Sequence, residues 1–559
     1  MTASGSRVVV SDATTVDFFL DAESSYRYET EDAQQTEVKD KLDAAVDLGY
    51  EALREEAIND HKDLAGKVSL DLGSSSGDAS LPTNERQENY ISAPDDDVEF
   101  ATLLFNYGRH LLIASSRETG NSDLPPGLQA IWNQDYAPAW GGKYTININT
   151  EMNYWPAETT SLNGLTSPLW SLLKLAQKRG QDVAERMYGC PGWLLHHNID
   201  LWGDAAPVDN GTAYSVWPMG GTWLVLHMME HYRFTGDKTF LAEEAYPLLK
   251  DAFAFFECYL FDLNGHLTTG PSCSPENRFT IPPGKSIAGT TEALALSPAL
   301  DNSLLTELLT ALNETHTALN ISTSDPLSQK IQTYLPALRA PEIGSYGQIL
   351  EWIDELNSTD QGHRHFSPIF GLFPGTQLTP LASQDLAAAA GTLLDNRMAN
   401  GGGSTGWSRA WSIALYARLY RGADAWSNLQ SWLSTFLLPN LWNSDSGGAS
   451  PFQIDGNFGF VGAVVEMLLQ SHLGVVHLLP ALPGDAVPAG KVGGLRARGG
   501  FEVGIEWEGG ALKRATVKSL LGGELSLLVA NGMGFLLDGE AYQGPVLTEK
   551  GREYVVTLQ

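Results

Sequence analysis

The chain has 559 residues, of which 43% are hydrophobic and 18% charged, a composition typical of a folded protein rather than a disordered one. At about 150 residues per domain, this length predicts three or four domains, or one large barrel with attachments. The 67 acidic and 35 basic residues give a net charge of −32, which repels phosphate backbones and anionic lipids. We therefore expect neither nucleic acid nor a membrane as a partner, and no stretch approaches the roughly 18 apolar residues that span a bilayer.

The first 97 residues contain little that predicts a core. Two strand-like runs, at 6–10 and 14–22, either join a sheet elsewhere or belong to a domain that lies outside this sequence. Apolar residues at helical spacing predict an amphipathic connecting helix over 36–64, and the turn-rich stretch 73–86 predicts a loop.

Helical patterns dominate from residue 98 to 472, and strands are scarce between them. Twelve helices in alternating pairs predict an (α/α)6 barrel. The patterns cover 98–116, 149–162, 167–188, 220–235, 237–262, 297–319, 325–339, 347–357, 384–399, 405–421, 423–438 and 457–472. Several connections are long, and they hold most of the unusual polar and aromatic residues, so we expect the binding site there.

From residue 473 the pattern changes to period two. Phe501, Val503, Ile505 and Trp507 would share one face of a strand, and Gly509-Gly510 predicts a tight turn. With a last strand in VTLQ at the chain end, residues 473–559 are predicted to form an all-β domain.

Three cysteines, Cys190, Cys258 and Cys273, have no metal-ligand spacing and allow at most one disulfide. Four acceptor triplets for N-glycosylation are compatible with a secreted glycoprotein; they begin at Asn210, Asn313, Asn320 and Asn357. The opening residues lack the apolar region of a signal peptide.

The segment 143–158, KYTININTEMNYWPAE, spends its length on amides and aromatic rings. Amides such as Asn147 and Asn149 discriminate hydroxyl patterns, and rings such as Trp155 stack on the apolar face of a sugar. Because asparagines also populate turns and aromatic residues also line cores, a structural role and a sugar site are equally compatible with this segment alone.

Two carboxylates stand out on long connections. Glu276 follows a helix in a Ser, Pro and Asn loop, and Asp455 precedes an apolar helix among Phe452, Phe458 and Phe460. A solvated loop residue and a helix cap are the structural alternatives. Together with segment 143–158, however, the pair suits hydrolysis of a glycosidic bond. In that reaction one carboxyl donates a proton to the leaving oxygen, and the other carboxylate, or a group that it polarises, directs water at the anomeric carbon.

Competing motifs are weaker. The run GGGSTG at 401–406 matches patterns of serine hydrolases and dinucleotide sites, but a predicted helix rather than a strand precedes it, so we expect a helix end followed by an N-cap at Ser404 or Thr405. His363 and His365, and likewise His196-His197, lack a carboxylate or cysteine cluster nearby in sequence. We therefore predict no metal and no cofactor.

The ordered motifs as a whole resemble glycoside hydrolase family 95, the α-L-fucosidase family, over about residues 80–510. They are LPTNER, GLQAIWN, KYTININTEMNYWPAE, HHNIDLWGDAAP, WPMGGTWL, SPEN, GHRHF, TGWSRAW, PFQIDGNFGF and LPALP. The resemblance implies a mainly α fold. We expect a short remnant of an N-terminal β domain at 1–30, a helical linker and loop at 31–97, a catalytic (α/α)6 barrel at 98–472 and a C-terminal β domain at 473–559, in a chain that lacks most of the N-terminal domain.

The resemblance also implies a chemistry: inverting hydrolysis of terminal α-linked L-fucose, typically α-1,2. Glu276 would be the general acid, while Asn147 and Asn149 would position the water with help from Asp455. A polarised amide in a rigid site can order water before reaction.

For the remaining properties, the resemblance implies a fucosylated oligosaccharide or polysaccharide as substrate and a secreted or extracellular location; the oligomeric state stays unknown. His365 is expected to contact the sugar, although Pro368 stands where many members have a second histidine, and Trp155 and Trp217 are expected to stack on it. An inactive or truncated glycan-binding protein and an α-L-galactosidase remain alternatives.

Overall fold

The computed structural model describes residues 2–74, 77–118, 123–285 and 289–559, and the chain divides into two compact units. One unit comprises Met1–Gly66 and Glu118–Asp123, and the other comprises Lys67–Arg117 and Leu124–Gln559. The larger unit thus begins inside the range expected for a linker.

The smaller unit contains one hairpin and two helices. Strands β1 (Thr2–Ser4) and β2 (Arg7–Val9) pair antiparallel. The strand predicted over 14–22 is wrong: no strand forms in that described range, where Phe18 is 78% exposed, because nothing pairs with it.

The predicted connecting helix is two helices, α1 (Glu31–Leu48) and α2 (Tyr50–Ala65). Gly49 separates them with φ of 80°, a backbone conformation that a glycine adopts without steric cost. Thr30 caps the start of α1 by accepting a hydrogen bond from the backbone N–H of Ala33 at 3.1 Å.

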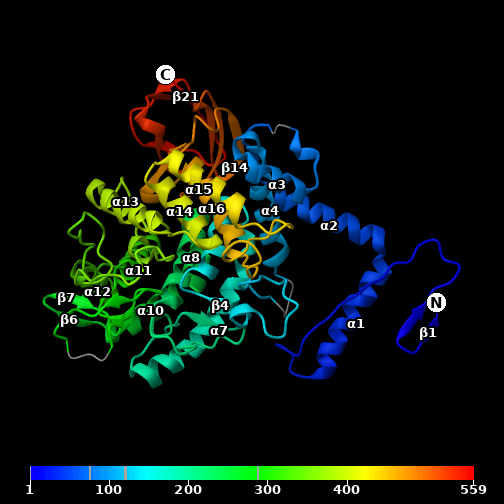
Figure 1. The fold of residues 1–559 in the computed structure, drawn as a ribbon, viewed down its shortest axis with the longest axis horizontal. Coiled ribbons are helices and arrows are strands. Elements are labelled where there is room, and N and C mark those ends of the chain that lie inside the picture. The colour runs from blue at the N-terminus through cyan, green and yellow to red at the C-terminus, as the bar shows by residue number, and fades with distance from the viewer. Residues whose placement is uncertain (1, 75–76, 119–122, 286–288) are drawn as a thin grey trace. The chain divides into compact units, whose positions relative to one another are not determined.

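The larger unit is rich in helices (Figure 1). They are α3 (Thr83–Ser92), α4 (Glu99–Ser115), α5 (Asn149–Asn153), α6 (Trp155–Thr159), α7 (Ser167–Val183), α8 (Gly220–Thr235), α9 (Lys238–Phe240), α10 (Tyr246–Tyr259), α11 (Ala299–Ala318), α12 (Pro326–Tyr334), α13 (Gln384–Ala399), α14 (Gly406–Arg418), α15 (Gly422–Thr435) and α16 (Asp455–Leu468). Within the described residues, eleven of the twelve predicted helical ranges contain a helix, and α3 forms at the end of the stretch expected to be a loop. Residues 75 and 76 of that stretch lie outside the described part of the chain.

The helix predicted over 347–357 is wrong. This range holds no helix among the residues that the structure describes, and it forms turns that bury Glu351 and Trp352. Trp352 packs edge-on against Phe279 with ring centroids 5.2 Å apart. The Glu351 carboxylate is bound by Ser274, Asn277 and Arg397, and these contacts favour a loop over a helix here.

The helices form an (α/α)6 barrel around a buried centre. Every residue of α16 is buried, and α16 packs against α4, α5, α6 and α14. A helix buried on every side is mostly apolar, and the three polar side chains of α16, Asp455, Asn457 and Glu466, each have hydrogen-bonding partners.

The strand-rich end of the chain, orange to red in Figure 1, forms two sheets. The seven-stranded sheet has the order β19-β18-β21-β16-β15-β14-β3, and the four-stranded sheet has the order β12-β13-β17-β20. Their strands are β3 (Ser69–Asp71), β12 (Leu469–Gln470), β13 (Val475–Leu478), β14 (Gly490–Ala497), β15 (Phe501–Glu508), β16 (Ala511–Ser519), β17 (Gly523–Val529), β18 (Phe535–Leu537), β19 (Glu540–Ala541), β20 (Val546–Thr548) and β21 (Glu553–Leu558).

The expected alternation in this domain is confirmed, since Phe501, Val503, Ile505 and Trp507 are all buried on β15. Gly509 and Gly510, both with positive φ, form the turn to β16 as predicted. The sequence pattern did not reveal β3, which precedes the barrel in the chain yet pairs antiparallel with β14.

Charged pairs and a disulfide fix parts of the larger unit. Arg498, beyond the end of β14, contacts Glu230 of α8 at 2.5 Å. Burial opposes ionisation of Glu230, yet Arg498 and Arg233 hold its pKa down to about 2. The single disulfide compatible with three cysteines joins Cys190 to Cys258, and Cys273 is free and buried.

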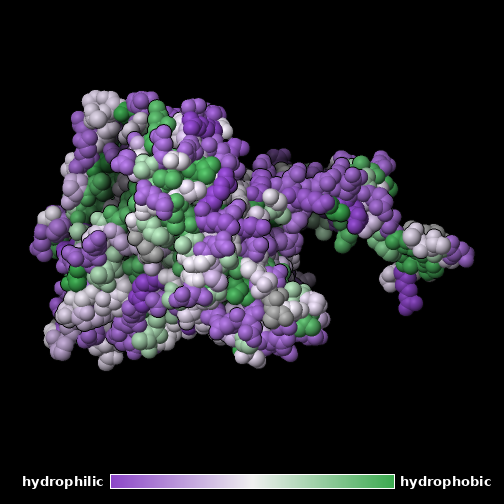
Figure 2. Space-filling model, turned by 90° about the horizontal axis from the view of Figure 1, so that it is seen from above, coloured by the Kyte–Doolittle hydropathy of each residue, from purple (hydrophilic) through white to green (hydrophobic). Residues whose placement is uncertain are grey.

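The surface of the larger unit is mixed. Hydrophilic and hydrophobic residues are interspersed on the face that Figure 2 shows. Among the described residues, no helix is both long and apolar enough to cross a bilayer.

Candidate active site

Short strands carry the asparagine-rich segment to the barrel centre. β4 (Tyr144–Thr145) pairs with β5 (Asn198–Ile199), and the Ile146 N–H donates to the His197 carbonyl at 2.8 Å. Asn147 follows this pairing, and Asn149 is the first residue of α5. Both amides are buried, so each needs a hydrogen-bonding partner.

Those partners are the two predicted carboxylates. Nδ2 of Asn147 donates to Oε1 of Glu276 at 3.0 Å, and Nδ2 of Asn149 donates to Oδ2 of Asp455 at 2.5 Å. The structure therefore brings all four predicted catalytic residues together and divides them into two amide–carboxyl pairs.

Glu276 follows β8 (Ser272–Cys273), and its side chain is 20% exposed. Besides the Asn147 amide it binds Arg364, whose guanidinium donates to Oε2 at 2.6 Å. Nε2 of His365 lies 3.8 Å from the same oxygen. Arg364 is a site residue that the sequence analysis passed over, although it stands in the quoted motif GHRHF.

Asp455 begins α16 and is fully buried. Its Oδ1 accepts the Gly456 backbone N–H at 2.7 Å, so both oxygens have a donor. Burial nevertheless raises the pKa of Asp455 to about 7, and the Asn149 and Gly456 donors only partly offset that rise. A carboxyl of this kind can gain or lose a proton near neutral pH.

A cavity of about 910 Å³ opens at this site. Its walls include Asn149, Glu276, Arg364 and His365, together with the aromatic residues Trp140, Tyr214 and Trp407. Asn147 and Asp455 are not among its lining residues, and each contacts it through its partner. This volume exceeds that of one sugar ring and lies within the range of ligand pockets.

The expected stacking residues Trp155 and Trp217 do not line this cavity. Trp155 packs edge-on against Phe373 with centroids 4.6 Å apart, and Trp217 is fully buried beside Trp223. Trp217 is thus a core aromatic, whereas Trp155 is half-buried and lines a separate cavity together with Trp223 and Phe373.

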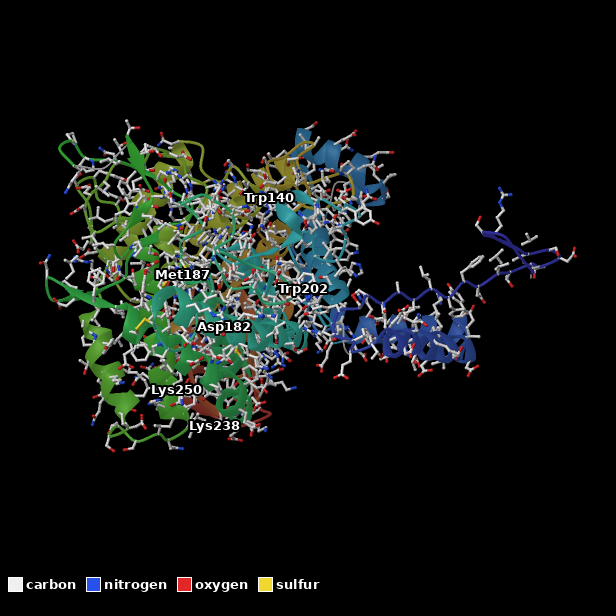
Figure 3. All side chains as sticks on the ribbon, turned by 90° about the horizontal axis from the view of Figure 1, so that it is seen from below. Trp140, Asp182, Met187, Trp202, Lys238 and Lys250 are labelled. Carbon is white, nitrogen blue, oxygen red and sulfur yellow. A yellow bond between two sulfur atoms is a disulfide. The ribbon has the colours of Figure 1, made fainter. Side chains whose placement is uncertain are left out.

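Two other tryptophans, Trp140 and Trp407, line the cavity. Trp140, labelled in Figure 3, is 47% exposed on the connection that precedes β4. Trp407 is buried and packs edge-on against His365 with centroids 4.7 Å apart. The only sequence signal for Trp140 was its position in a long connection.

The histidines are neutral side chains in this site. Burial, with nearby Arg364 and Arg397, depresses the pKa of His365 well below its usual range. Within the described residues, no group of three or more His, Cys, Asp or Glu side chains could hold a metal ion.

The glycine-rich run 401–406 ends one helix and starts another, as expected. Thr405 caps α14 by accepting a hydrogen bond from the Ser408 N–H at 3.3 Å. Thr405 and Ser404 also line the cavity, which the sequence did not indicate.

Comparison with known proteins agrees with this architecture. The family model of the glycosyl hydrolase family 95 catalytic domain matches residues 49–468, and that of the glycoside hydrolase family 95 C-terminal domain matches residues 470–557.

Two relatives are similar over most of the chain. Alpha-L-fucosidase 2 of Arabidopsis thaliana is 36% identical over 488 residues, which cover 85% of this chain and 56% of the relative. The probable alpha-fucosidase A of Aspergillus niger is 33% identical over 482 residues, which cover 83% of this chain and 59% of the relative. The chain thus spans less than two thirds of the length of these relatives.

Among solved structures, a protein described as a kojibiose phosphorylase from the human microbiome has a TM-score of 0.60 at 9% identity. The match covers 94% of this chain and 73% of that chain, and at this identity it concerns the fold alone. The matches of both family models and the identity to the two fucosidases show that the chain belongs to glycoside hydrolase family 95.

Proposed function

We propose that this protein is an inverting α-L-fucosidase that releases terminal α-1,2-linked L-fucose from neutral glycans. The fucosidase names of its relatives support the substrate. The observation that carries the mechanism is the Asn149 amide, which lines the cavity of Glu276 and donates at 2.5 Å to the buried Asp455.

Glu276 acts as the general acid in this proposal. Its protonated carboxyl donates to the glycosidic oxygen as the bond to fucose breaks. The carboxylate that results is then held by donors already in place, the Asn147 amide at 3.0 Å and the Arg364 guanidinium at 2.6 Å. These two contacts also fix the direction in which the acid points.

Asp455 acts through Asn149, on the side of the anomeric carbon opposite to Glu276. Its negative charge polarises the Asn149 amide, whose oxygen then accepts more strongly from a water molecule in the cavity. This water attacks the anomeric carbon and gives its proton to the Asn149–Asp455 pair. A carboxyl with a pKa of about 7 can hold that proton. Asn147 orients the acid through its Nδ2, and its buried Oδ1, which has no hydrogen-bond partner among the described residues, can accept from the same water as Asn149.

Binding of the sugar rests on neutral and aromatic groups. His365 offers an uncharged ring nitrogen, and the half-exposed Trp140 offers a face on which the sugar beyond fucose can stack. The cavity carboxylates Glu276, Asp209 and Asp445 outnumber its cations Lys143 and Arg364. This balance favours neutral glycans over sulfated or carboxylated ones.

The direct test is release of fucose from a 2′-fucosylated oligosaccharide, with the α-L-galactosyl analogue as the competing substrate. We expect fucose release, and we expect Glu276→Gln and Asp455→Asn each to lower kcat by about 100-fold or more while leaving the melting temperature within a few degrees. Faster hydrolysis of the galactosyl analogue would mean that the protein is an α-L-galactosidase rather than an α-L-fucosidase. Near-normal turnover in either variant would refute the assigned roles.

We further propose that the protein acts in an oxidising, extracellular compartment. The disulfide between Cys190 and Cys258 supports this location, and the acceptor residues Asn210, Asn313 and Asn320 are all exposed, as is Asn357. Treatment of protein from a eukaryotic source with an N-glycosidase tests this location, since we expect a loss of mass at one or more of these asparagines. No change in mass would count against a secreted glycoprotein.

A further inference from the structure

We propose that Glu351 is a positioning residue for the general acid, fixing the loop from which Glu276 reaches the cavity; this inference rests on the proposed function. Glu351 is 8% exposed and does not line the cavity. It lies in the range 347–357, which was predicted to be a helix and instead forms turns.

The Glu351 carboxylate binds the residues on both sides of the acid. Its Oε1 accepts from the Ser274 hydroxyl at 2.7 Å, and its Oε2 accepts from Nδ2 of Asn277 at 2.9 Å. In the motif SPEN, therefore, the side chains of the first and last residues, Ser274 and Asn277, both donate to the same carboxylate. Because Glu276 lies between them, its backbone is held from both ends.

A third contact joins this carboxylate to the neighbouring loop. Arg397 donates to Oε2 of Glu351 at 2.7 Å, and it also donates to the carbonyl oxygen of His365. The residue before His365 is Arg364, which binds Glu276 itself. Glu351 thus fixes both the acid loop and, through Arg397, the loop that supplies the cation beside the acid.

One further hydrogen bond closes the network. The Ser367 hydroxyl donates to the Pro275 carbonyl at 2.7 Å, so the residue that follows GHRHF also binds the acid loop directly. Every residue from Ser274 to Asn277 therefore has a partner outside its own loop. Loss of Glu351 removes two of these attachments and leaves Arg397 buried without its carboxylate.

This arrangement matters for proton donation because the transfer depends steeply on geometry. A displacement of about 1 Å can cost about 100-fold in rate. Attack by water depends instead on Asn149 and Asp455, whose hydrogen bonds involve neither Glu351 nor the residues that Glu351 binds. We therefore expect Glu351 to affect proton donation to the leaving group and to leave water attack nearly unchanged.

Glu351→Gln tests this inference by comparing two leaving groups. It keeps the side-chain volume but places an amide among three donors. On a 2′-fucosylated oligosaccharide, whose leaving group needs a proton, we expect kcat to fall by about 100-fold. On α-L-fucosyl fluoride, whose leaving group departs without general acid, we expect a change under about 3-fold. Glu276→Gln should show the same selectivity.

Glu466→Gln provides the matched control. Glu466 is 7% exposed in its side chain and pairs with the buried Arg418 at 2.5 Å, yet it lies outside the active-site cavity. We expect this variant to change kcat by the same factor on both substrates. Should Glu351→Gln fail to fold, Ser274→Ala removes one donor and keeps the Arg397 pair, and we expect a smaller loss with the same selectivity.

Two results would overturn the inference while the proposed function stands. One is an equal loss on both substrates in a folded Glu351 or Ser274 variant, and the other is no loss on either when wild-type protein cleaves both. Wild-type protein that cleaves neither substrate would refute the proposed function itself, and the inference with it.

Discussion

Glu276 and Asp455 are each paired with one amide, and the two pairs differ in exposure. Glu276 reaches the cavity and shares its oxygens with Asn147 and Arg364, whereas Asp455 is sealed behind Asn149. Environment therefore assigns different tasks to two residues of the same chemical type. The exposed carboxyl can meet a leaving group, and the buried one can act only through its amide.

Asp455 makes stability depend on pH in a direction opposite to that of an ordinary salt-bridged carboxylate. Its folded pKa of about 7 lies above the unfolded value of 3.8, so the folded protein retains a proton that the unfolded chain releases. This group therefore lowers stability as pH rises from about 4 to about 7, and the loss is complete above that range.

Asp455→Asn removes this dependence. We subtract the melting temperature of wild type from that of the variant. We expect this difference to be a few degrees more positive at about pH 8 than at about pH 5, because only wild type carries the buried charge at high pH. Differential scanning calorimetry at both pH values measures the difference. An offset that does not change with pH would mean that Asp455 is already ionised at pH 5.

Residue types were readable from the sequence, but side-chain directions were not. Asn147, Asn149, Glu276 and Asp455 were identified because the resemblance to glycoside hydrolase family 95 distinguished a site role from the turns, caps and solvated loops that these residue types also suit. Trp155 offered no such contrast, since an aromatic ring suits a core and a sugar site equally well. Glu351 was missed because its neighbours Leu350, Trp352 and Ile353 fit a helical pattern.

At the level of elements, two helix starts meet around one side chain. Asn443 donates through Nδ2 to the Gln453 carbonyl at 2.7 Å and through its backbone to Oδ1 of Asn457 at 2.7 Å. A Cβ on Gly406 would lie 1.7 Å from the Asn443 Oδ1, and one on Gly456 would lie 2.3 Å from it. These glycines let α14 and α16 begin close together, which sets the position of Asp455.

Gly406→Ala is therefore expected to destabilise the protein by about 1–3 kcal/mol through overpacking. It should also reduce turnover, because Asn443 binds Gln453 and Asn457 on either side of Asp455, and displacing it would disturb the start of α16. Gly164→Ala is the control, since its added Cβ would meet no atom within 4 Å. Urea unfolding and kcat measure both effects, and equal stability in the two variants would contradict this packing argument.

Helices were predicted well where apolar spacing reflected a packed face, as in α4 and α11. The prediction failed over 347–357 because the polar contacts of Glu351 outweigh local periodicity there. Pairing of β3 with β14 joins segments about 420 residues apart, and no local pattern encodes such a contact.

For the whole molecule, the disulfide between Cys190 and Cys258 ties the connection after α7 to α10 across a separation of 68 residues. A disulfide that closes a loop of that length lowers the conformational entropy of the unfolded chain, which raises the free energy of unfolding by about 4 kcal/mol. The sequence allowed one bridge without identifying its partners, because the pairing depends on the folded positions of three cysteines.

The double variant Cys190→Ser/Cys258→Ser is expected to lose about 4 kcal/mol of unfolding free energy, with the barrel still folded. A reductant should lower the melting temperature of wild type toward that of the variant and leave the variant unchanged. Chemical and thermal unfolding with and without reductant provide the measurement. A wild-type protein indifferent to complete reduction would contradict a stabilising bridge.

Attack by water held by Asn149 and Asp455, as Glu276 protonates the leaving oxygen, is a single displacement at the anomeric carbon. NMR spectra recorded in the first minutes of hydrolysis of a 2′-fucosylated oligosaccharide test it most directly. The mechanism predicts β-L-fucose as the first product, followed by mutarotation. Initial α-L-fucose would require a double displacement and would contradict the mechanism.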